Sequence, residues 1–166
     1  MLYHVDKPYP KPQVEKKNLK YADILSFSYA GAISEQTAIH QYLYQSFCFN
    51  DEFSEILEKI SIVEMHHFKL LAQTIHLLGL EPNYQSATTD YRFIPWTSEN
   101  VPYPPDKKEM LKIDIHSETL AIQTYQAAIS QIDDPYIQQL LKRIIEDEEL
   151  HIQIFQTLLD KEKDVS

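Results

Sequence analysis

Two segments of the chain share a pattern in which a glutamate and a histidine interrupt an apolar helical repeat. Each reads Ile-x-x-x-Glu-x-x-His, and the two copies are 84 residues apart, with Glu64 and His67 in the first and Glu148 and His151 in the second. Spacings of three and four residues place these side chains on one face of a helix. Because the rest of that face is apolar, any fold of this chain has to hold ionisable side chains in its core.

A second pair of segments repeats in the same way. Residues 34–42 read SEQTAIHQY and residues 117–125 read SETLAIQTY, so that Ser-Glu-x-x-Ala-Ile-x-x-Tyr recurs with an offset of 83 residues. Glu35 and Glu118 occupy the same position in the two copies. The sequence therefore predicts two helical hairpins of one design, facing each other about an approximate two-fold axis.

Helical periodicity and capping signals predict four helices of about 25 residues each. They span residues 21–50, 51–79, 106–132 and 135–161. Asn50 or Asp51 is a suitable N-cap for the second helix and Gly79 a suitable residue just beyond its end. Asp106 with Glu109 resembles a capping box for the third, and Pro135 fits the first position of the fourth.

The connections determine the predicted topology. The first two and the last two helices are joined by short turns, which makes each pair antiparallel. Residues 80–105 contain five prolines and no helical pattern, and an extended chain of that length easily spans a helix of ~38 Å. The fold predicted is all-α, a four-helix bundle over residues 21–161 with a long crossover between the second and third helices. Residues 1–20, with three prolines and five lysines, form an extended N-terminal arm that packs on the surface or on a neighbouring subunit.

Composition excludes several classes of protein. The net charge of −10 disfavours binding to nucleic acid or to an anionic membrane surface. The single cysteine rules out an internal disulfide and a four-cysteine metal site. No stretch of 18 apolar residues and no signal-peptide core is found, so we expect a cytoplasmic protein.

The four glutamates on the inward faces carry an electrostatic cost that limits how the site can be built. The bundle brings six ionisable side chains to one level of its core: Glu35, Glu64, His67, Glu118, Glu148 and His151. Burying one carboxylate costs several kcal/mol even after relaxation, against a net domain stability of about 5–15 kcal/mol. Either most of the carboxylates take up protons, or the cluster is exposed, or cations lie among them. Two divalent metal ions would cancel the four negative charges.

The spacing favours the metal interpretation. Two Glu-x-x-His pairs with one further glutamate from each of the other helices form the ligand set of dinuclear carboxylate bundles. Oxygen-rich ligation with one imidazole per ion suits manganese or iron. We expect Glu64 and Glu148 to bridge the two ions, Glu35 and Glu118 to bind one ion each, and the histidines to be terminal ligands.

Other residues are candidates for supporting roles. Tyr42 and Tyr125 lie two turns after Glu35 and Glu118 on the same faces, where their hydroxyls can hydrogen-bond a ligating carboxylate. Asp147 either orients a histidine of a neighbouring helix or is a surface charge.

The two halves differ at one inward position, where Asp114 in the third helix corresponds to Gly31 in the first. Asp114 is a candidate extra ligand, a proton relay or a carboxylate facing a water channel, and a solvated residue near the helix start is the alternative. We expect Gly31 to lie opposite it and this end of the site to be the substrate entrance.

Four stretches of sequence resemble the ferritin-like superfamily, specifically rubrerythrin-type domains and manganese catalases, including the short catalase-like proteins of spore coats. They are YAGAISEQTAIHQYLYQ, ISIVEMHHFKLLAQTIHLLG, FIPWTSE and IIEDEELHIQIF. The resemblance covers residues 21–160 and implies a dinuclear manganese or iron centre that acts on hydrogen peroxide or dioxygen. A spore-coat location is the alternative to the cytoplasm.

The resemblance implies catalase-like decomposition of peroxide, which needs no external reductant. The alternatives are a rubrerythrin-like peroxidase or ferroxidase, or an iron-binding or structural coat protein with a residual metal site. This chain has no rubredoxin cysteines, so a peroxidase would need an external electron donor protein. It has Ile115 where rubrerythrins carry a switching glutamate, and Ser117 where some manganese catalases carry a basic residue. We also expect a homo-oligomer, a dimer or larger.

Overall fold

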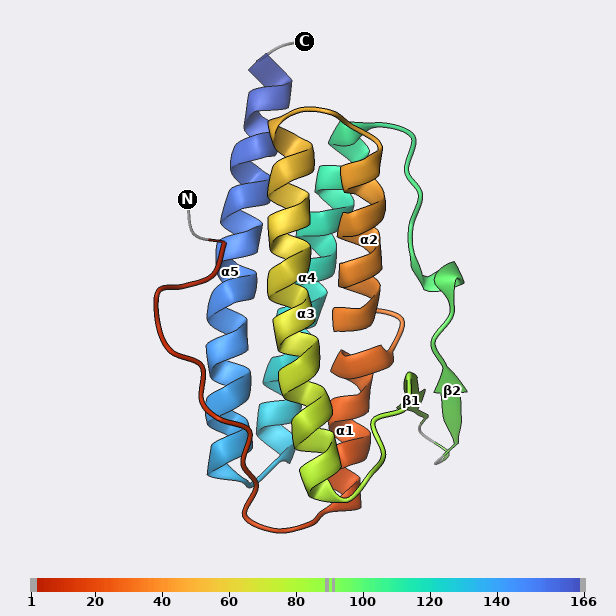
Figure 1. Cartoon of the computed structure of the whole chain (residues 1–166), viewed down its shortest axis with the longest axis vertical. Helices are drawn as coiled ribbons and strands as arrows, with labels where there is room; N and C mark the ends of the chain where they lie inside the picture. The colour runs from red at the N-terminus through yellow and green to blue at the C-terminus, as the bar shows by residue number, and fades with distance from the viewer. Residues whose placement is uncertain (1–2, 89, 91, 165–166) are drawn as a thin grey trace.

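The computed structural model describes residues 3–88, 90 and 92–164. Within them the main elements are α1 (Leu19–Ala30), α2 (Glu35–Phe47), α3 (Glu52–Leu78), α4 (Lys107–Gln131) and α5 (Pro135–Asp164). α3, α4 and α5 are three columns of an antiparallel bundle, and α1 with α2 forms the fourth (Figure 1). The predicted all-α four-helix bundle with a long crossover is confirmed.

Helix ends follow the local sequence signals. The Asp51 carboxylate accepts hydrogen bonds from the amides of Phe53 and Ser54 and so caps α3. α3 ends at Gly79, which adopts the left-handed conformation with φ 101° that glycine tolerates best. Asp106 accepts from the amide of Glu109 at the start of α4.

The prediction of one continuous helix over residues 21–50 is wrong, because residues 31–34 break it. Gly31 ends α1 in an extended conformation, with φ −78° and ψ −174°. A Cβ atom at Gly31 would lie 2.5 Å from the carbonyl oxygen of Phe27, so the chain passes too close to itself here for any other residue. Ser34 then caps α2 by accepting a hydrogen bond from the Thr37 amide. The break places Glu35 in the first turn of a new helix.

The crossover covers α1 and α2. It contains a small antiparallel hairpin, β1 (Gln85–Ala87) and β2 (Phe93–Pro95), and a 3₁₀ helix, η1 (Ser98–Asn100). The Trp96 indole donates to the Thr37 hydroxyl (2.9 Å), and the Ala87 amide donates to the Ser26 hydroxyl (2.8 Å). These contacts join the crossover to the broken column, and Figure 1 shows the crossover running along that side of the bundle.

The N-terminal arm lies on the opposite side, along α3 and α5 of its own chain (Figure 1). In the single chain the described residues of the arm pack on its own bundle. Arg143 of α5 donates hydrogen bonds to the carbonyl oxygens of Val5 (2.8 Å) and Lys7 (3.1 Å). Nearer α1, the Glu15 amide donates to Asp134 (2.8 Å).

The core consists of two apolar clusters with a polar layer between them. Leu71 of α3 and Ile144 of α5 belong to the first cluster, and Ile60 of α3 and Phe155 of α5 belong to the second. The two Glu-x-x-His pairs lie between these residues along their helices, so the polar layer is sealed by hydrocarbon from both ends. None of the described helices carries an apolar stretch that could cross a lipid bilayer.

Candidate metal centre

The six predicted ligands meet in the polar layer. Glu35 comes from α2, Glu64 and His67 from α3, Glu118 from α4, and Glu148 and His151 from α5. Each is at most 4% exposed. The alternative of an exposed charge cluster is therefore wrong.

These side chains form two overlapping groups whose potential ligand atoms lie within 4.8 Å of one another. One group is Glu35, Glu64, His67 and Glu148, and the other is Glu64, Glu118, Glu148 and His151. Glu64 and Glu148 belong to both groups. A buried set of this composition can hold a metal ion.

The shared glutamates divide their oxygens between the two histidines. His67 Nδ1 lies 3.0 Å from Glu64 Oε2 and 3.3 Å from Glu148 Oε1. His151 Nδ1 lies 2.9 Å from the other oxygen of Glu64 and 3.1 Å from the other oxygen of Glu148. Each carboxylate thus faces both halves of the site, as a bridging ligand does.

The outer glutamates complete the symmetry. Glu35 Oε2 lies 3.7 Å from His67 Nδ1, and Glu118 Oε1 lies 3.7 Å from His151 Nδ1. Each half therefore combines one outer glutamate, one histidine and one oxygen from each shared glutamate. This arrangement repeats the two-fold relation of the sequence.

The unpartnered atoms show that the site fits cations. Glu64 Oε1, Glu148 Oε2 and His151 Nδ1 are buried without a hydrogen-bond partner, although the two oxygens lie 2.9 Å and 3.1 Å from the nitrogen. Buried polar atoms are normally satisfied, so atoms that converge without bonding are typical of ligands directed at a common point. The outer nitrogen of each imidazole, Nε2, makes a hydrogen bond away from the cluster. His67 Nε2 bonds to Asp147 (3.0 Å) and His151 Nε2 bonds to the Tyr3 carbonyl (2.8 Å). The Nδ1 atom of each ring therefore faces the shared glutamates, His67 Nδ1 at hydrogen-bond distance from Glu64 (3.0 Å) and His151 Nδ1 without a hydrogen-bond partner.

The chain's own groups leave the negative charge poorly compensated. Burial and repulsion from Glu148 and Glu64 raise the pKa of Glu118 to about 8 and also raise that of Glu35. Burial alone would lower the pKa of His151, but the carboxylate of Glu64 raises it well above its usual value. Protons are thus drawn into the cluster where cations are absent, and metal ions would compete with them.

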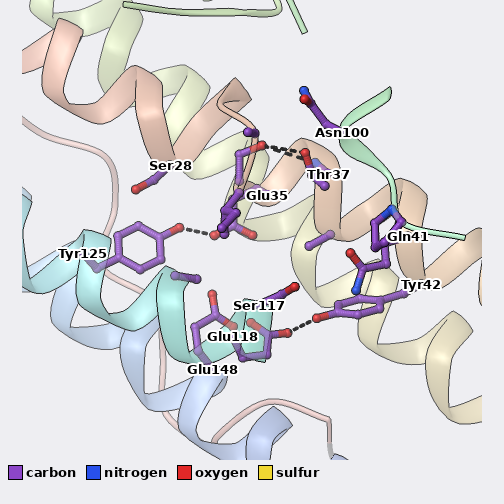
Figure 2. A pocket seen from close by; sticks show the side chains of 16 residues that line it. Ser28, Glu35, Thr37, Gln41, Tyr42, Asn100, Ser117, Glu118, Tyr125 and Glu148 are labelled. Carbon is purple, nitrogen blue, oxygen red and sulfur yellow. Dashed lines mark hydrogen bonds between the residues drawn. The ribbon is translucent and has the colours of Figure 1, made fainter. Parts of the chain in front are cut away.

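Tyr42 and Tyr125 make the predicted type of hydrogen bond, in a crossed arrangement. The Tyr42 hydroxyl on α2 donates to Glu118 on α4, and the Tyr125 hydroxyl on α4 donates to Glu35 on α2 (Figure 2). Burial, followed by the charge of the bonded glutamate, raises the pKa of both phenols well above 10, so both remain donors. Each half of the molecule therefore braces the outer glutamate of the other half.

Replacing either tyrosine with phenylalanine is expected to weaken metal binding about ten-fold. Removal of a residue that hydrogen-bonds a metal ligand typically lowers metal affinity by about 10–100-fold, and this is the lower end of that range. Tyr42→Phe and Tyr125→Phe should have similar effects because the two bonds are related by the two-fold axis. Isothermal titration of the chelated protein with Mn²⁺ measures this. Tyr29→Phe is the matched control, because this buried hydroxyl donates to the Pro82 carbonyl, outside the site. Equal affinities for all three variants and the wild type would contradict the prediction.

Asp147 is fully buried and orients a histidine, so the surface-charge alternative is wrong. Besides His67, it accepts hydrogen bonds from the Tyr9 hydroxyl (2.5 Å) and the Val5 amide (2.7 Å). It also pairs with Arg143 of α5 (2.7 Å). Burial would raise the pKa of Asp147, but the His67 and Tyr9 bonds hold it below its usual value.

Asp114 is also buried, so it is not a solvated residue at the helix start. It belongs to neither ligand group, which argues against an extra ligand. Gly31 does not lie opposite it as predicted, since Asp114 Oδ1 accepts from the amides of Gln41 (2.6 Å) and Gln45 (2.8 Å). Desolvation raises its pKa to about 7.

A cavity of about 210 Å³ reaches the site from the broken helix column. Its lining includes Ala32 and Ser34 at the break, Asn100 of η1 and the glutamates Glu35, Glu118 and Glu148 (Figure 2). Asp114 is not among the lining residues. The cavity therefore lies at the helix break beneath the crossover and not beside Asp114, where the sequence predicted an entrance.

Comparison with known proteins places this architecture in a family. Residues 33–165 match the ferritin-like domain. The chain belongs to the ferritin-like family. A probable manganese catalase of Clostridium acetobutylicum is 30% identical to this ferritin-like chain, over 91% of the chain and 75% of that protein.

Solved structures share the fold of this ferritin-like chain. Wild-type KatB, a manganese catalase from Anabaena, superposes with a TM-score of 0.84 at 24% identity, over 97% of this chain and 80% of KatB. The bacterioferritin of Desulfovibrio desulfuricans, described with a diiron site, gives a TM-score of 0.73 at 24% identity, over 87% of this chain and 81% of that chain. The likeness to both structures concerns the fold.

Proposed function

We propose that this ferritin-like chain binds two manganese or iron ions and decomposes hydrogen peroxide to water and dioxygen. The observation that carries the proposal is the pair of overlapping ligand groups, in which Glu64 and Glu148 each face both histidines. The 30% identity to a probable manganese catalase supports the choice of reaction.

In the proposed centre Glu64 and Glu148 would contribute to both halves, while His67 with Glu35 would complete one half and His151 with Glu118 the other. The ions would supply the two-electron change that lets one peroxide molecule be reduced to two water molecules while another is oxidised to dioxygen. The balance is two hydrogen peroxide to two water and one dioxygen, so no other reductant is consumed. The cavity at the helix break admits a molecule as small as peroxide to the edge formed by the glutamates.

Proton handling falls to residues beside the ligands. Reduction of peroxide to water takes up two protons, and its oxidation to dioxygen releases two. Asp114 lies one turn before Glu118 on α4, and its negative charge acts on Tyr42, which donates to Glu118. With a pKa of about 7, Asp114 can hold or release a proton near neutral pH. We assign it the role of a proton store for the Glu118 side of the centre.

Oxygen evolution tests the proposal directly. Protein stripped with a chelator and refilled with Mn²⁺ or Fe²⁺ should bind two ions per chain, measured by elemental analysis. It should then release one dioxygen for every two peroxide molecules in an oxygen electrode without added reductant. Peroxide consumption that depends on an added electron donor and releases no dioxygen would contradict catalase activity and indicate a peroxidase.

A ferroxidase is the second candidate, favoured by the likeness in fold to a bacterioferritin. The same ligands accept iron, and Fe²⁺ would then be the substrate that dioxygen or peroxide oxidises. Stopped-flow absorbance during Fe²⁺ oxidation separates the two activities. Uptake of iron far beyond two ions per chain would instead indicate storage.

A further inference from the structure

We infer that the N-terminal arm, residues 3–9, is a latch for the metal centre that positions both ligand imidazoles, so that arm docking and metal binding stabilise each other. The inference rests on the proposed dinuclear centre and adds to it residues that touch neither the ions nor the substrate. It assigns a role to Tyr9, to the Val5 amide and to the Tyr3 carbonyl.

The arm contacts the outer side of both histidine ligands. On one half, the Tyr3 carbonyl oxygen accepts directly from His151 Nε2 (2.8 Å). On the other half, Asp147 accepts from His67 Nε2 (3.0 Å), and the arm fixes Asp147. Of the described residues, no others hydrogen-bond to the outer nitrogens of these rings.

Two groups of the arm share Asp147 with His67. The Val5 amide donates to Oδ1 (2.7 Å), and the Tyr9 hydroxyl donates to Oδ2 (2.5 Å), the oxygen that also meets His67. Arg143 pairs with Oδ1 (2.7 Å). With four partners in fixed directions, the Asp147 carboxylate can hold the His67 imidazole in one orientation. A fixed orientation strengthens metal binding by the imidazole.

Packing holds the arm over this network. The Tyr9 ring lies edge-on to the rings of His66 (4.5 Å) and His67 (5.9 Å) of α3. The Arg143 guanidinium lies 4.2 Å from the centre of the Tyr9 ring and donates to the Val5 and Lys7 carbonyls. Lys7 also pairs with Glu146 of α5 (2.7 Å).

The coupling follows from linkage. If the docked arm favours the metal-binding orientation of the two imidazoles, metal ions must favour the docked arm by the same free energy. The Val5 amide is a local reporter, because its hydrogen bond to Asp147 exists only while the arm is docked. Its hydrogen exchange should therefore slow when the centre is filled.

Two measurements on the full-length chain test the latch. First, isothermal titration of the chelated protein with Mn²⁺ compares wild type with Tyr9→Phe, which removes one hydroxyl and keeps the ring in place. We expect affinity to fall about ten-fold. The matched control is Tyr21→Phe, a similarly half-buried tyrosine whose hydroxyl accepts from the Asp133 amide away from the centre, and it should bind Mn²⁺ as wild type does.

Second, hydrogen exchange followed by mass spectrometry compares arm peptides containing Val5 with and without Mn²⁺. Mn²⁺ should slow exchange in wild type and do so less in Tyr9→Phe. Co²⁺ absorption provides a further readout, because a change in the visible bands of Tyr9→Phe reports altered ligand geometry, which a purely structural role of Tyr9 would not produce.

Two results would overturn the latch. One is a wild-type chain that binds two Mn²⁺ ions while Tyr9→Phe binds them equally well. The other is an arm whose exchange is the same with and without Mn²⁺. If wild type binds neither Mn²⁺ nor Fe²⁺, the proposed function fails together with the latch, so the two failures are distinguishable.

Discussion

Glu148→Gln should abolish peroxide decomposition and reduce metal affinity by more than 100-fold. Glu148 belongs to both ligand groups and presents one oxygen to each histidine. An amide keeps the shape of the side chain but removes the negative charge and replaces one ligand oxygen with a donor. The loss of metal affinity should exceed the 10–100-fold that is typical when a residue that only hydrogen-bonds a ligand is removed.

Metal-dependent stability measures this loss without activity. At a free Mn²⁺ concentration 100 times the wild-type dissociation constant, one such site stabilises the fold by about 2.7 kcal/mol. A 100-fold weaker site would contribute only about 0.4 kcal/mol. Thermal unfolding with and without Mn²⁺ therefore separates the variant from the wild type.

Glu149→Gln is the matched control for this change. Glu149 follows Glu148 directly on α5 but is exposed, so the same substitution there should leave metal content and oxygen evolution unchanged. Retention of two ions and of Mn²⁺-dependent stabilisation in Glu148→Gln would remove Glu148 from the ligand set.

Asp114→Asn should make the protein more stable at pH 8 and leave it nearly unchanged at pH 4. Burial raises the pKa of Asp114 from 3.8 to about 7 in the folded chain. Between these values the folded state keeps a proton that the unfolded state has released, so wild-type stability falls as pH rises through this window. A separation of about three pH units corresponds to a penalty of about 4 kcal/mol above pH 7.

Asparagine removes that penalty and suits the surroundings. The groups from α2 that hydrogen-bond Asp114 are the neutral amides of Gln41 and Gln45, and the neighbouring Tyr42 stays protonated because its own pKa is raised. Gln45 Oε1 has no hydrogen-bond partner, so it can accept from the new amide. Urea unfolding of chelated protein at several pH values gives the comparison with wild type.

The control for this prediction is Asp133→Asn, which changes an exposed carboxyl. Its free energy of unfolding should stay close to that of the wild type. A stability difference between Asp114→Asn and wild type that stays constant from pH 4 to pH 8 would contradict the raised pKa. Refilled Asp114→Asn should also keep two ions but turn over more slowly if Asp114 stores protons.

The bundle could be predicted from sequence because its signals are local and periodic. The inward positions recur every three or four residues, so one pass along each helix brings Glu64 and His67 to the same face. The internal repeat then places the second pair at the same level as the first. The free-energy cost of buried charge gives the last piece of information. It is large enough that four buried glutamates must either take up protons or be neutralised by cations.

The break at residues 31–34 was missed because apolar periodicity continues through it. The sequence does contain a signal for the break. Gly31 is a residue type typical of a helix end, and Ser34, three residues later, is typical of a helix N-cap. The periodic interpretation instead assigned Gly31 to the inward face. Because residues of the break line the cavity, the same error placed the expected entrance beside Asp114, which the cavity does not touch.

The contacts of the arm could not be predicted from local pattern. Residues 1–20 show no periodicity, and the carboxylate that Val5 and Tyr9 both hydrogen-bond, Asp147, lies far away in the sequence on α5. The sequence therefore left open whether Asp147 orients a histidine or faces solvent. Only the assembled chain places a tyrosine, an amide and an arginine around that carboxylate.

The span of chain between the arm and its partners has a consequence for biosynthesis. Val5 and Asp147 are 142 positions apart, so the arm can dock only after the segment that forms α5 has been synthesised. The first hairpin, with Glu35, Glu64 and His67, is translated well before that. On this account the first hairpin can collapse early, but the hydrogen bonds that orient His67 through Asp147 are complete only after α5 has been synthesised and the arm has docked on it.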